Sequence, residues 1–475
     1  MCANRSLTDG RLPLGIACTL ACSVPCFADL PITGMPVPEL AVFDEMMVDF
    51  MEVNGIEAGL LGIMEDGVIV YQRGFGWKDA GHTTTLRHDA LMRIASVTKP
   101  FTAAAIQRLY ATNQLDPNDV VFDLGQAGGG VLPYTAFPSL QDDRMGQITV
   151  QQILSHSSGL PTNNGNDPMF REIEIADDFN DAGIPVGYPP GRVRTTQWVL
   201  GGTLASDPDA GIVAYSNFGF QVLGQVVEAV SGMSHIDFVR ERVLGPIEWL
   251  PVTEVVAGRT FESDLDPREP WYDNNEMATN VFNPDGDPVR RPHGGYEHEL
   301  HFASGAIVSS TTALLHLAEN YYIQAENFNA GQATTYGALT NGVRATRSHG
   351  GLLWGTEAWV RQRSDGVNFV VIFNKGTVGT TYALDMRDLI DAELDAGTIT
   401  WPTQGVDGQW VDFTQFFGGS GAYERPWRLL GIALSASPAE ATLNFKPGTS
   451  SWTGTINQRV RMRAPEGGVV RIGQL

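Results

Sequence analysis

Cysteine is almost absent from this chain. Four of the 475 residues are cysteines, and all of them lie within the first 28 positions (Cys2, Cys18, Cys22 and Cys26). From residue 29 onward the sequence therefore excludes disulfide bonds and thiol-based catalysis. The same lack of cysteine leaves no thiolate ligands of the kind that many structural zinc sites use.

The same N-terminal segment has the pattern of a secretory signal peptide. Arg5 and Arg11 give a positive start, a mostly apolar stretch follows, and Cys26-Phe27-Ala28 places small residues before a cleavage point. We expect residues 1–28 to be removed, the mature chain to begin at Asp29, and the protein to be secreted or periplasmic. A disordered tail and a membrane anchor are the alternative interpretations, with lipid anchoring as a minor variant.

Lysine is scarce as well, with four residues against 27 arginines and 54 acidic residues, which give a net charge of -23. Such a chain repels nucleic acid and anionic membrane surfaces. No later stretch is long and apolar enough to span a bilayer. We expect a small-molecule substrate, no nucleic-acid partner and no stable membrane insertion, while the composition leaves the oligomeric state open.

One of the four lysines completes a motif that carries chemistry. In Ser96-Val97-Thr98-Lys99, the serine and lysine stand three positions apart, so on a helix their side chains share one face. A neutral Lys99 could take the Ser96 proton and make the hydroxyl a nucleophile without any catalytic histidine. Because lysine is ordinarily charged at neutral pH, burial or a nearby cation must lower its pKa. The alternative is an ordinary capped surface helix.

Three further segments follow in a fixed order: 154–160 (Leu-Ser-His-Ser-Ser-Gly-Leu), Tyr215-Ser216-Asn217 and His349-Gly350-Gly351. With these four motifs the chain resembles the serine β-lactamase-like hydrolases of the class C type, over roughly residues 38–394. That group includes class C β-lactamases, D-Ala-D-Ala carboxypeptidases, D-aminopeptidases and the family VIII carboxylesterases. The resemblance implies a serine hydrolase that needs no cofactor, and marks His156 as structural.

The resemblance also implies roles for the residues that match its motifs. Ser96 would be the nucleophile, Lys99 the base or proton relay, and Tyr215 the group that passes the proton to the leaving group. Asn217 would bond Lys99 or a substrate carbonyl. Seen alone, Tyr215 reads as a buried aromatic residue at a helix start, and Asn217 as a helix cap.

The third motif implies the oxyanion and substrate-binding part of the site. By the family pattern, the backbone N–H groups of Ser96 and Leu352 would stabilise the tetrahedral oxygen. Gly350 and Gly351, which follow His349, would let the strand approach the substrate closely. Their alternative interpretation is a turn that enters a strand.

The fold class expected is α+β, an α/β sandwich of the β-lactamase/transpeptidase type. Hairpin signals at Asp66-Gly67 and Asp365-Gly366 stand near the two ends of the family segment, which predicts an antiparallel sheet flanked by helices, with a mainly helical region inserted between them. Residues 29–395 would form the catalytic domain and residues 396–475 a small β-rich appendage. We expect residues 161–211 to be loop-rich, as a lid, a substrate wall or a plain surface excursion.

Two rival motifs are weaker. His298-Glu299-Leu300-His301, with His293 nearby, lacks the His-Glu-x-x-His spacing of a zinc site, so we expect no metal and place these histidines in loops near the cleft. The run 418–422 (Gly-Gly-Ser-Gly-Ala) fails the nucleophile-elbow pattern at its fifth position and predicts a flexible loop.

Three functions fit the sequence to different degrees. The first is a secreted carboxylesterase that acts through an acyl-Ser96 intermediate. The second is a β-lactamase, a D-Ala-D-Ala carboxypeptidase or a D-aminopeptidase, which would acylate the same serine with an amide. The third is a non-catalytic binding or sensor protein. Retention of Lys99 and Tyr215 argues against the third, and His349-Gly350 in place of a Lys-Thr or His-Thr carboxylate-binding pair shifts the balance toward esters.

Overall fold

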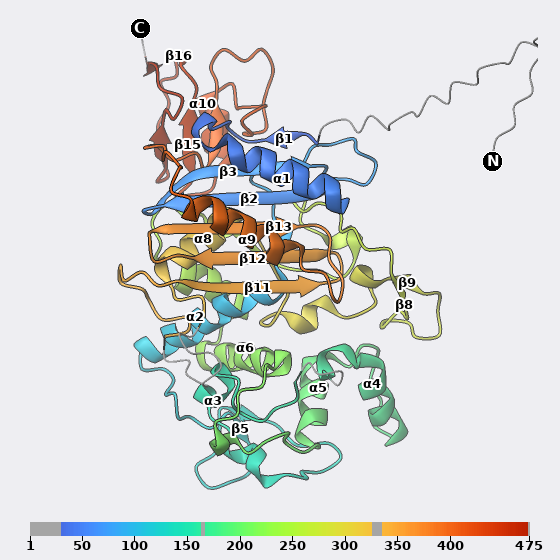
Figure 1. The fold of residues 1–475 in the computed structure, drawn as a ribbon. Coiled ribbons are helices and arrows are strands. Elements are labelled where there is room, and N and C mark those ends of the chain that lie inside the picture. Colours follow the sequence, from blue (N-terminus) through green and yellow to red (C-terminus); the bar gives the residue numbers. More distant parts are fainter. Residues whose placement is uncertain (1–29, 163–166, 325–334, 474–475) are drawn as a thin grey trace, which may run out of the picture.

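The computed structural model describes residues 30–162, 167–324 and 335–473. Its centre is a six-stranded sheet in the order β1-β3-β2-β13-β12-β11, in which every neighbouring pair is antiparallel (Figure 1). The expected signal segment 1–28 lies outside the described residues. The strands of this sheet are β1 (Ile32–Thr33), β2 (Ala58–Glu65), β3 (Val68–Gly76), β11 (Arg347–Leu353), β12 (Thr356–Gln362) and β13 (Val367–Phe373).

Both predicted hairpins are present. Asp66 and Gly67 join β2 to β3 with φ angles of 47° and 80°, the left-handed conformation that a tight two-residue turn needs. Asp365 and Gly366 lie between β12 and β13, with φ 97° at the glycine. Because β2 pairs with β13, the two ends of the family segment form one continuous sheet.

Helices cover both faces of this sheet (Figure 1). α1 (Ala41–Asn54) and α9 (Tyr382–Asp395) lie on one face, and α8 (Thr311–Asn320) lies on the other. Two glycines of β2 allow these helices to come close. A Cβ on Gly59 would stand 2.9 Å from Met51 Sδ of α1, and one on Gly62 would stand 2.9 Å from Thr311 of α8. The expected α+β sandwich is thus confirmed.

The region between β3 and β11 is mainly helical, as the sequence predicts. A short sheet in the order β4-β10-β7 links it to the core. Residues 161–211 contain more helix than the loop-rich segment that the sequence predicts. Two ten-residue helices, α4 and α5, lie between the loops. The elements of the region are β4 (Met92–Arg93), α2 (Thr98–Ala111), β5 (Phe122–Asp123), β6 (Leu132–Pro133), α3 (Val150–Leu154), α4 (Glu172–Asp181), α5 (Gly191–Leu200), α6 (Asn217–Ser231), α7 (His235–Phe238), β7 (Val255–Ala257), β8 (Met277–Ala278), β9 (Val289–Arg290) and β10 (Ile307–Ser309).

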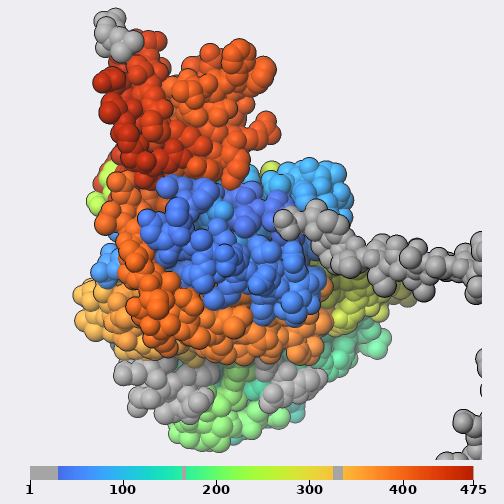
Figure 2. All heavy atoms as spheres, turned by 45° about the horizontal axis from the view of Figure 1, so that its top comes forward, coloured from blue at the N-terminus to red at the C-terminus, as the bar shows by residue number. Residues whose placement is uncertain are grey.

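The C-terminal appendage has a small hydrophobic core of its own, which includes Val411, Leu443 and Phe445. Besides the predicted strands it contains a helix, α10. It protrudes from the body (Figure 2) and touches it beside β1 and β3, where Gly34 N donates to Glu424 at 2.6 Å. The domain division at residue 396 stays a prediction. The appendage elements are β14 (Gln409–Val411), α10 (Leu430–Ala436), β15 (Thr442–Phe445), β16 (Gly448–Ser450), β17 (Arg461–Arg463) and β18 (Val470–Ile472).

Among the described residues, no helix combines the length and apolar character that crossing a membrane requires.

Candidate active site

Ser96 stands in the short turn between β4 and α2. A 3-10 turn, Ala95–Val97, leads directly into the helix, and Ala95 before the serine has φ 46°. A non-glycine residue in this conformation is strained, and such strain is often found at functional sites. The turn leaves Ser96 half-buried at the wall of a cavity, while its neighbours Ala95 and Val97 are fully buried.

Lys99 lies one helical turn further, with none of its surface exposed. Its Nζ is 3.0 Å from Ser96 Oγ, 2.8 Å from Asn217 Oδ1 and 2.7 Å from the carbonyl oxygen of Ser304. The amide oxygen and the carbonyl can only accept. A neutral amine has two N–H donors for them, so its lone pair is left for Ser96.

Burial lowers the pKa of the Lys99 ammonium to about 7, and the nearby Asp167 carboxylate opposes this shift. A large fraction of Lys99 is therefore neutral near pH 7, which the sequence argument requires of a lysine base. Asp167 itself is buried, and burial raises the pKa of its carboxyl group.

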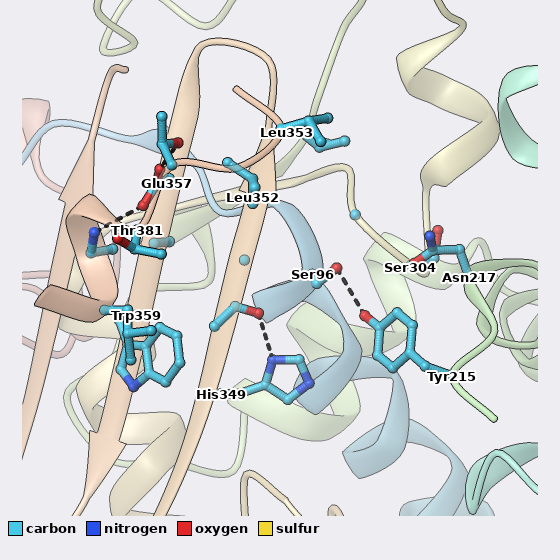
Figure 3. Close-up of a pocket in the computed structure, with 18 of the residues that line it drawn as sticks. Ser96, Tyr215, Asn217, Ser304, His349, Leu352, Leu353, Glu357, Trp359 and Thr381 are labelled. Atoms are coloured by element: carbon cyan, nitrogen blue, oxygen red, sulfur yellow. Dashed lines mark hydrogen bonds between the residues drawn. The ribbon is translucent and has the colours of Figure 1, made fainter. Parts of the chain in front are cut away.

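Tyr215 is the second side chain that contacts the Ser96 hydroxyl. Its Oη lies 2.9 Å from Ser96 Oγ (Figure 3), and its ring lies 4.8 Å from Lys99 Nζ. Burial raises the pKa of the Tyr215 phenol, so the group stays protonated at neutral pH. His156 stacks on this ring at 4.7 Å between centroids, and its Nδ1 accepts the backbone N–H of Ser216 at 3.1 Å. Through these contacts His156 holds Tyr215 and Ser216 in position, which agrees with the structural role that the resemblance implies for this histidine.

Asn217 opens α6 but does not cap it. The cap is Ser216, whose Oγ accepts from Gly219 N at 3.0 Å, so the alternative interpretation of Asn217 as a cap is wrong. The Asn217 amide instead joins two side chains. Its oxygen accepts from Lys99, and its nitrogen donates to Asp167 Oδ2 at 2.7 Å. This fixes the orientation of the amide.

The third motif lies within the edge strand β11, so its interpretation as a turn is wrong. A Cβ on Gly351 would stand 2.3 Å from Ile94 O and 2.9 Å from Ser96 N, so only glycine lets the strand pass this close to the serine backbone. Leu352, the next residue, lines the same cavity as Ser96.

The substituents of β11 alternate between its two faces, and this separates His349 from Gly350. His349 lies on the Ser96 side (Figure 3), where its Nδ1 is 3.0 Å from Gly350 O. Burial and the Lys99 charge lower the pKa of His349 to about 3, so the imidazole is neutral. Gly350 faces Trp359 of β12, and a Cβ there would stand 2.3 Å from the indole ring.

The cavity around these groups has a volume of about 730 Å³. No lysine or arginine is present among the described residues that line it. The sequence analysis missed part of the cavity wall, because single aromatic residues carry no motif. The missed residues include Phe170, Trp354 and Trp359, and Phe170 contacts Trp354 edge-on at 5.5 Å.

Of the histidines considered for a metal, His301 lines the cavity and contacts Phe170 at 4.7 Å between ring centroids. His298 is buried in the same short helix, where its backbone N–H donates to Thr260 Oγ1 at 2.8 Å. Burial lowers the pKa of both imidazoles. His301 thus lies at the cleft as predicted, whereas His298 does not line the cavity, and both histidines belong to a short 3-10 helix, not to a loop.

A family model described as Beta-lactamase matches residues 43–392. A penicillin-binding protein from Bacillus subtilis (strain 168) is 29% identical over 189 residues, 38% of this chain and 34% of that protein. Esterase EstB from Burkholderia gladioli is 32% identical over 165 residues, 32% of this chain and 39% of its own. The matches thus span well under half of the length of these relatives.

A solved structure of D-amino acid amidase from Ochrobactrum anthropi SV3, complexed with D-phenylalanine, superposes with a TM-score of 0.51 at 19% identity. The superposition covers 75% of this chain and 98% of that one, and it shows the fold. Since the family model covers most of the sequence, the chain belongs to the Beta-lactamase family. Serine hydrolases of the β-lactamase fold make up this family, and the chain has that fold.

Proposed function

We propose that this protein hydrolyses neutral carboxylic esters through an acyl-Ser96 intermediate. The observation that carries the proposal is the lack of a fixed positive charge in the described lining of the cavity, which does include the carboxyl group of Glu357. Its described lining holds no lysine or arginine, Lys99 is buried behind Ser96, and the His349 imidazole is neutral. A substrate carboxylate would find no fixed cation there, whereas a neutral ester needs none.

In acylation, Ser96 Oγ attacks the ester carbonyl carbon while its proton passes to neutral Lys99. The carbonyl oxygen becomes negative, and we assign its stabilisation to the backbone N–H groups of Ser96 and Leu352, which border the same cavity. When the carbon–oxygen bond to the alcohol breaks, Tyr215 donates its proton to the leaving oxygen and takes one from the Lys99 ammonium, which lies 4.8 Å from the centre of its ring. The 2.9 Å and 3.0 Å contacts of Ser96 Oγ support this relay.

Deacylation reverses these steps with water as the nucleophile. Water gives its proton toward Tyr215 and Lys99, attacks the acyl carbon, and releases the acid and the free Ser96 hydroxyl. Because the pKa of Tyr215 is raised, a resting phenolate is disfavoured, so Lys99 takes the water proton and returns it to Ser96 Oγ when the acyl bond breaks. Asn217 and the Ser304 carbonyl hold the amine in place during both halves.

Export from the cytoplasm is part of the proposal and rests on the sequence pattern of residues 1–28. N-terminal sequencing of protein recovered from the exported fraction tests it. A first residue near Asp29 is expected, and exported protein that still begins with Met1 contradicts it.

Two experiments test the proposed activity. A fluorophosphonate probe should label wild-type protein once, and Ser96→Ala should abolish that labelling, whereas labelling that survives would reject Ser96 as the nucleophile. A substrate panel then decides the chemistry by comparing kcat/KM for p-nitrophenyl butyrate, a chromogenic cephalosporin and a D-amino-acid amide. The ester should be preferred. A preference for the cephalosporin or the amide would make the protein a β-lactamase or an amide hydrolase with the same nucleophile.

A further inference from the structure

The strongest unexplained surface feature lies in the appendage, far from the cavity. Phe416 and Phe417 are adjacent in the sequence, and each is 80% exposed. Their rings contact each other edge-on at 5.6 Å. Single exposed apolar residues are common on soluble proteins, but two protruding neighbouring phenylalanines indicate a binding surface.

The loop that carries the two rings is held by several hydrogen bonds. Asp412 accepts from the backbone N–H and the hydroxyl of Thr414, at 2.8 and 2.6 Å. Arg428 donates to the Phe416 carbonyl at 3.1 Å. After the two rings the chain passes close to the backbone of Pro426. A Cβ on Gly419 would stand 1.8 Å from Pro426 O, so only glycine fits at this position. The glycine run that failed as a nucleophile elbow therefore shapes the loop.

The charge of the appendage is opposite to that of the rest of the chain. Residues 396–475 contain seven Lys and Arg against five Asp and Glu, whereas residues 1–395 contain 24 against 49. The net charge of the whole chain conceals this difference. Electrostatic interactions fade over about 8 Å at physiological ionic strength, so a protruding appendage presents its own charge to a partner.

Two arginines next to the loop are available for an anionic partner. Arg425 and Arg428 are exposed, and neither forms an ion pair with an acidic side chain of the described chain. The segment after Arg428 adds Leu429 and Ile432, which are 52% and 45% exposed. Protruding rings beside exposed arginines that form no ion pair suit the interface of an anionic bilayer, where apolar groups enter the acyl boundary and cations meet headgroups. A protein interface would need a much larger complementary area.

We propose that Phe416 and Phe417, with Arg425 and Arg428, dock the protein onto membranes that contain anionic lipid. The appendage contacts the β1 and β3 edge of the sheet, and the cavity lies at the β11 edge. Because the sheet of six strands, spaced by about 4.8 Å, extends from one edge to the other, docking leaves the cavity open to water. This proposal does not depend on which substrate the enzyme cleaves.

Vesicle co-sedimentation of the full chain tests the proposal. Vesicles of phosphatidylcholine mixed with phosphatidylglycerol should carry the protein down, and pure phosphatidylcholine should carry less. Phe416→Ser with Phe417→Ser should lower the partition coefficient by at least about tenfold, because two buried rings are lost. Arg425→Gln with Arg428→Gln should lower it too, and should weaken its dependence on salt.

Val53→Ser provides the matched control, because Val53 is 85% exposed on α1, away from the loop, and its loss should leave vesicle binding unchanged. Ester turnover in solution should be the same for all these variants, which verifies folding. Three results would overturn the proposal: no sedimentation of the wild type with either vesicle, equal binding by the phenylalanine variant, or a wild-type dimer that this variant dissociates. The last result would assign the rings to a second copy of the chain.

Discussion

The side-chain oxygen of Asn217 accepts a hydrogen bond from Lys99 at 2.8 Å, although the two residues are 118 positions apart. Because the Asn217 nitrogen donates to Asp167, the amide cannot flip without losing both contacts. Lys99 must then act as the donor toward Asn217 and Ser304, which leaves its lone pair for Ser96 when it is neutral. The fraction of Lys99 that is neutral should therefore set the rate at which Ser96 is activated.

The rate should rise with pH through neutrality. Burial lowers the pKa of Lys99 to about 7, and only the neutral amine can accept the Ser96 proton. Below that pH, kcat/KM for a neutral ester should fall about tenfold per pH unit, and above it the rate should level off. Because the pKa of Tyr215 is raised, this residue should cause no decline at moderately alkaline pH. Titration of the released acid in a pH-stat checks this, and a profile that is flat across neutrality would contradict a Lys99 base.

Asp167→Asn should move that profile to lower pH. The Asp167 carboxylate favours the charged form of Lys99, so its removal lowers the lysine pKa further. The Asn side chain still has an oxygen that can accept from Asn217, so the plateau rate should change little. Asp181→Asn, at an exposed carboxylate at the end of α4, serves as the control and should leave the midpoint unchanged. A shift to higher pH would reject the coupling between Asp167 and Lys99.

Lys99 and Tyr215 should act as one unit. Both contact Ser96 Oγ, at 3.0 and 2.9 Å, and both are needed to move one proton from the nucleophile to the leaving group. Lys99→Ala and Tyr215→Phe should each lower kcat by at least about a hundredfold. The double variant should be little slower than either single one. Losses that multiply fully in single-turnover measurements would mean that the two residues work independently.

Gly350 and Trp359 should together determine whether carboxylate-bearing substrates are accepted. The sequence alone suggests that Gly350→Thr would restore a hydroxyl for such substrates. In the structure the added Cβ would stand 2.3 Å from the Trp359 ring, so this single change should lower turnover of esters and cephalosporins alike.

Gly350→Thr combined with Trp359→Val removes that clash. This pair should raise the cephalosporin-to-ester ratio of kcat/KM by about tenfold, the effect of roughly one satisfied polar contact. Trp359→Val alone is the control for the enlarged cavity. The same ratio in the pair and in the control would show that a hydroxyl at position 350 does not recognise the carboxylate.

Local sequence determined much of this protein. Ser96 and Lys99 are three positions apart, and each hairpin turn is specified by two adjacent residues, so helix and turn geometry bring these groups together without help from distant segments. The two helices within residues 161–211 were missed, because the many Asp, Asn, Gly and Pro residues of this segment conceal α4 and α5.

Tertiary structure decided the properties that make the motif a site. The lowered pKa of Lys99 requires burial, which depends on segments up to 205 positions away, such as the Ser304 carbonyl. Asp167 and Trp359 carry no motif, because their effect comes from the neighbours that folding gives them. Sequence spacing fixes contacts within one turn, whereas burial, charge coupling and the shape of a cavity arise only when distant elements pack together.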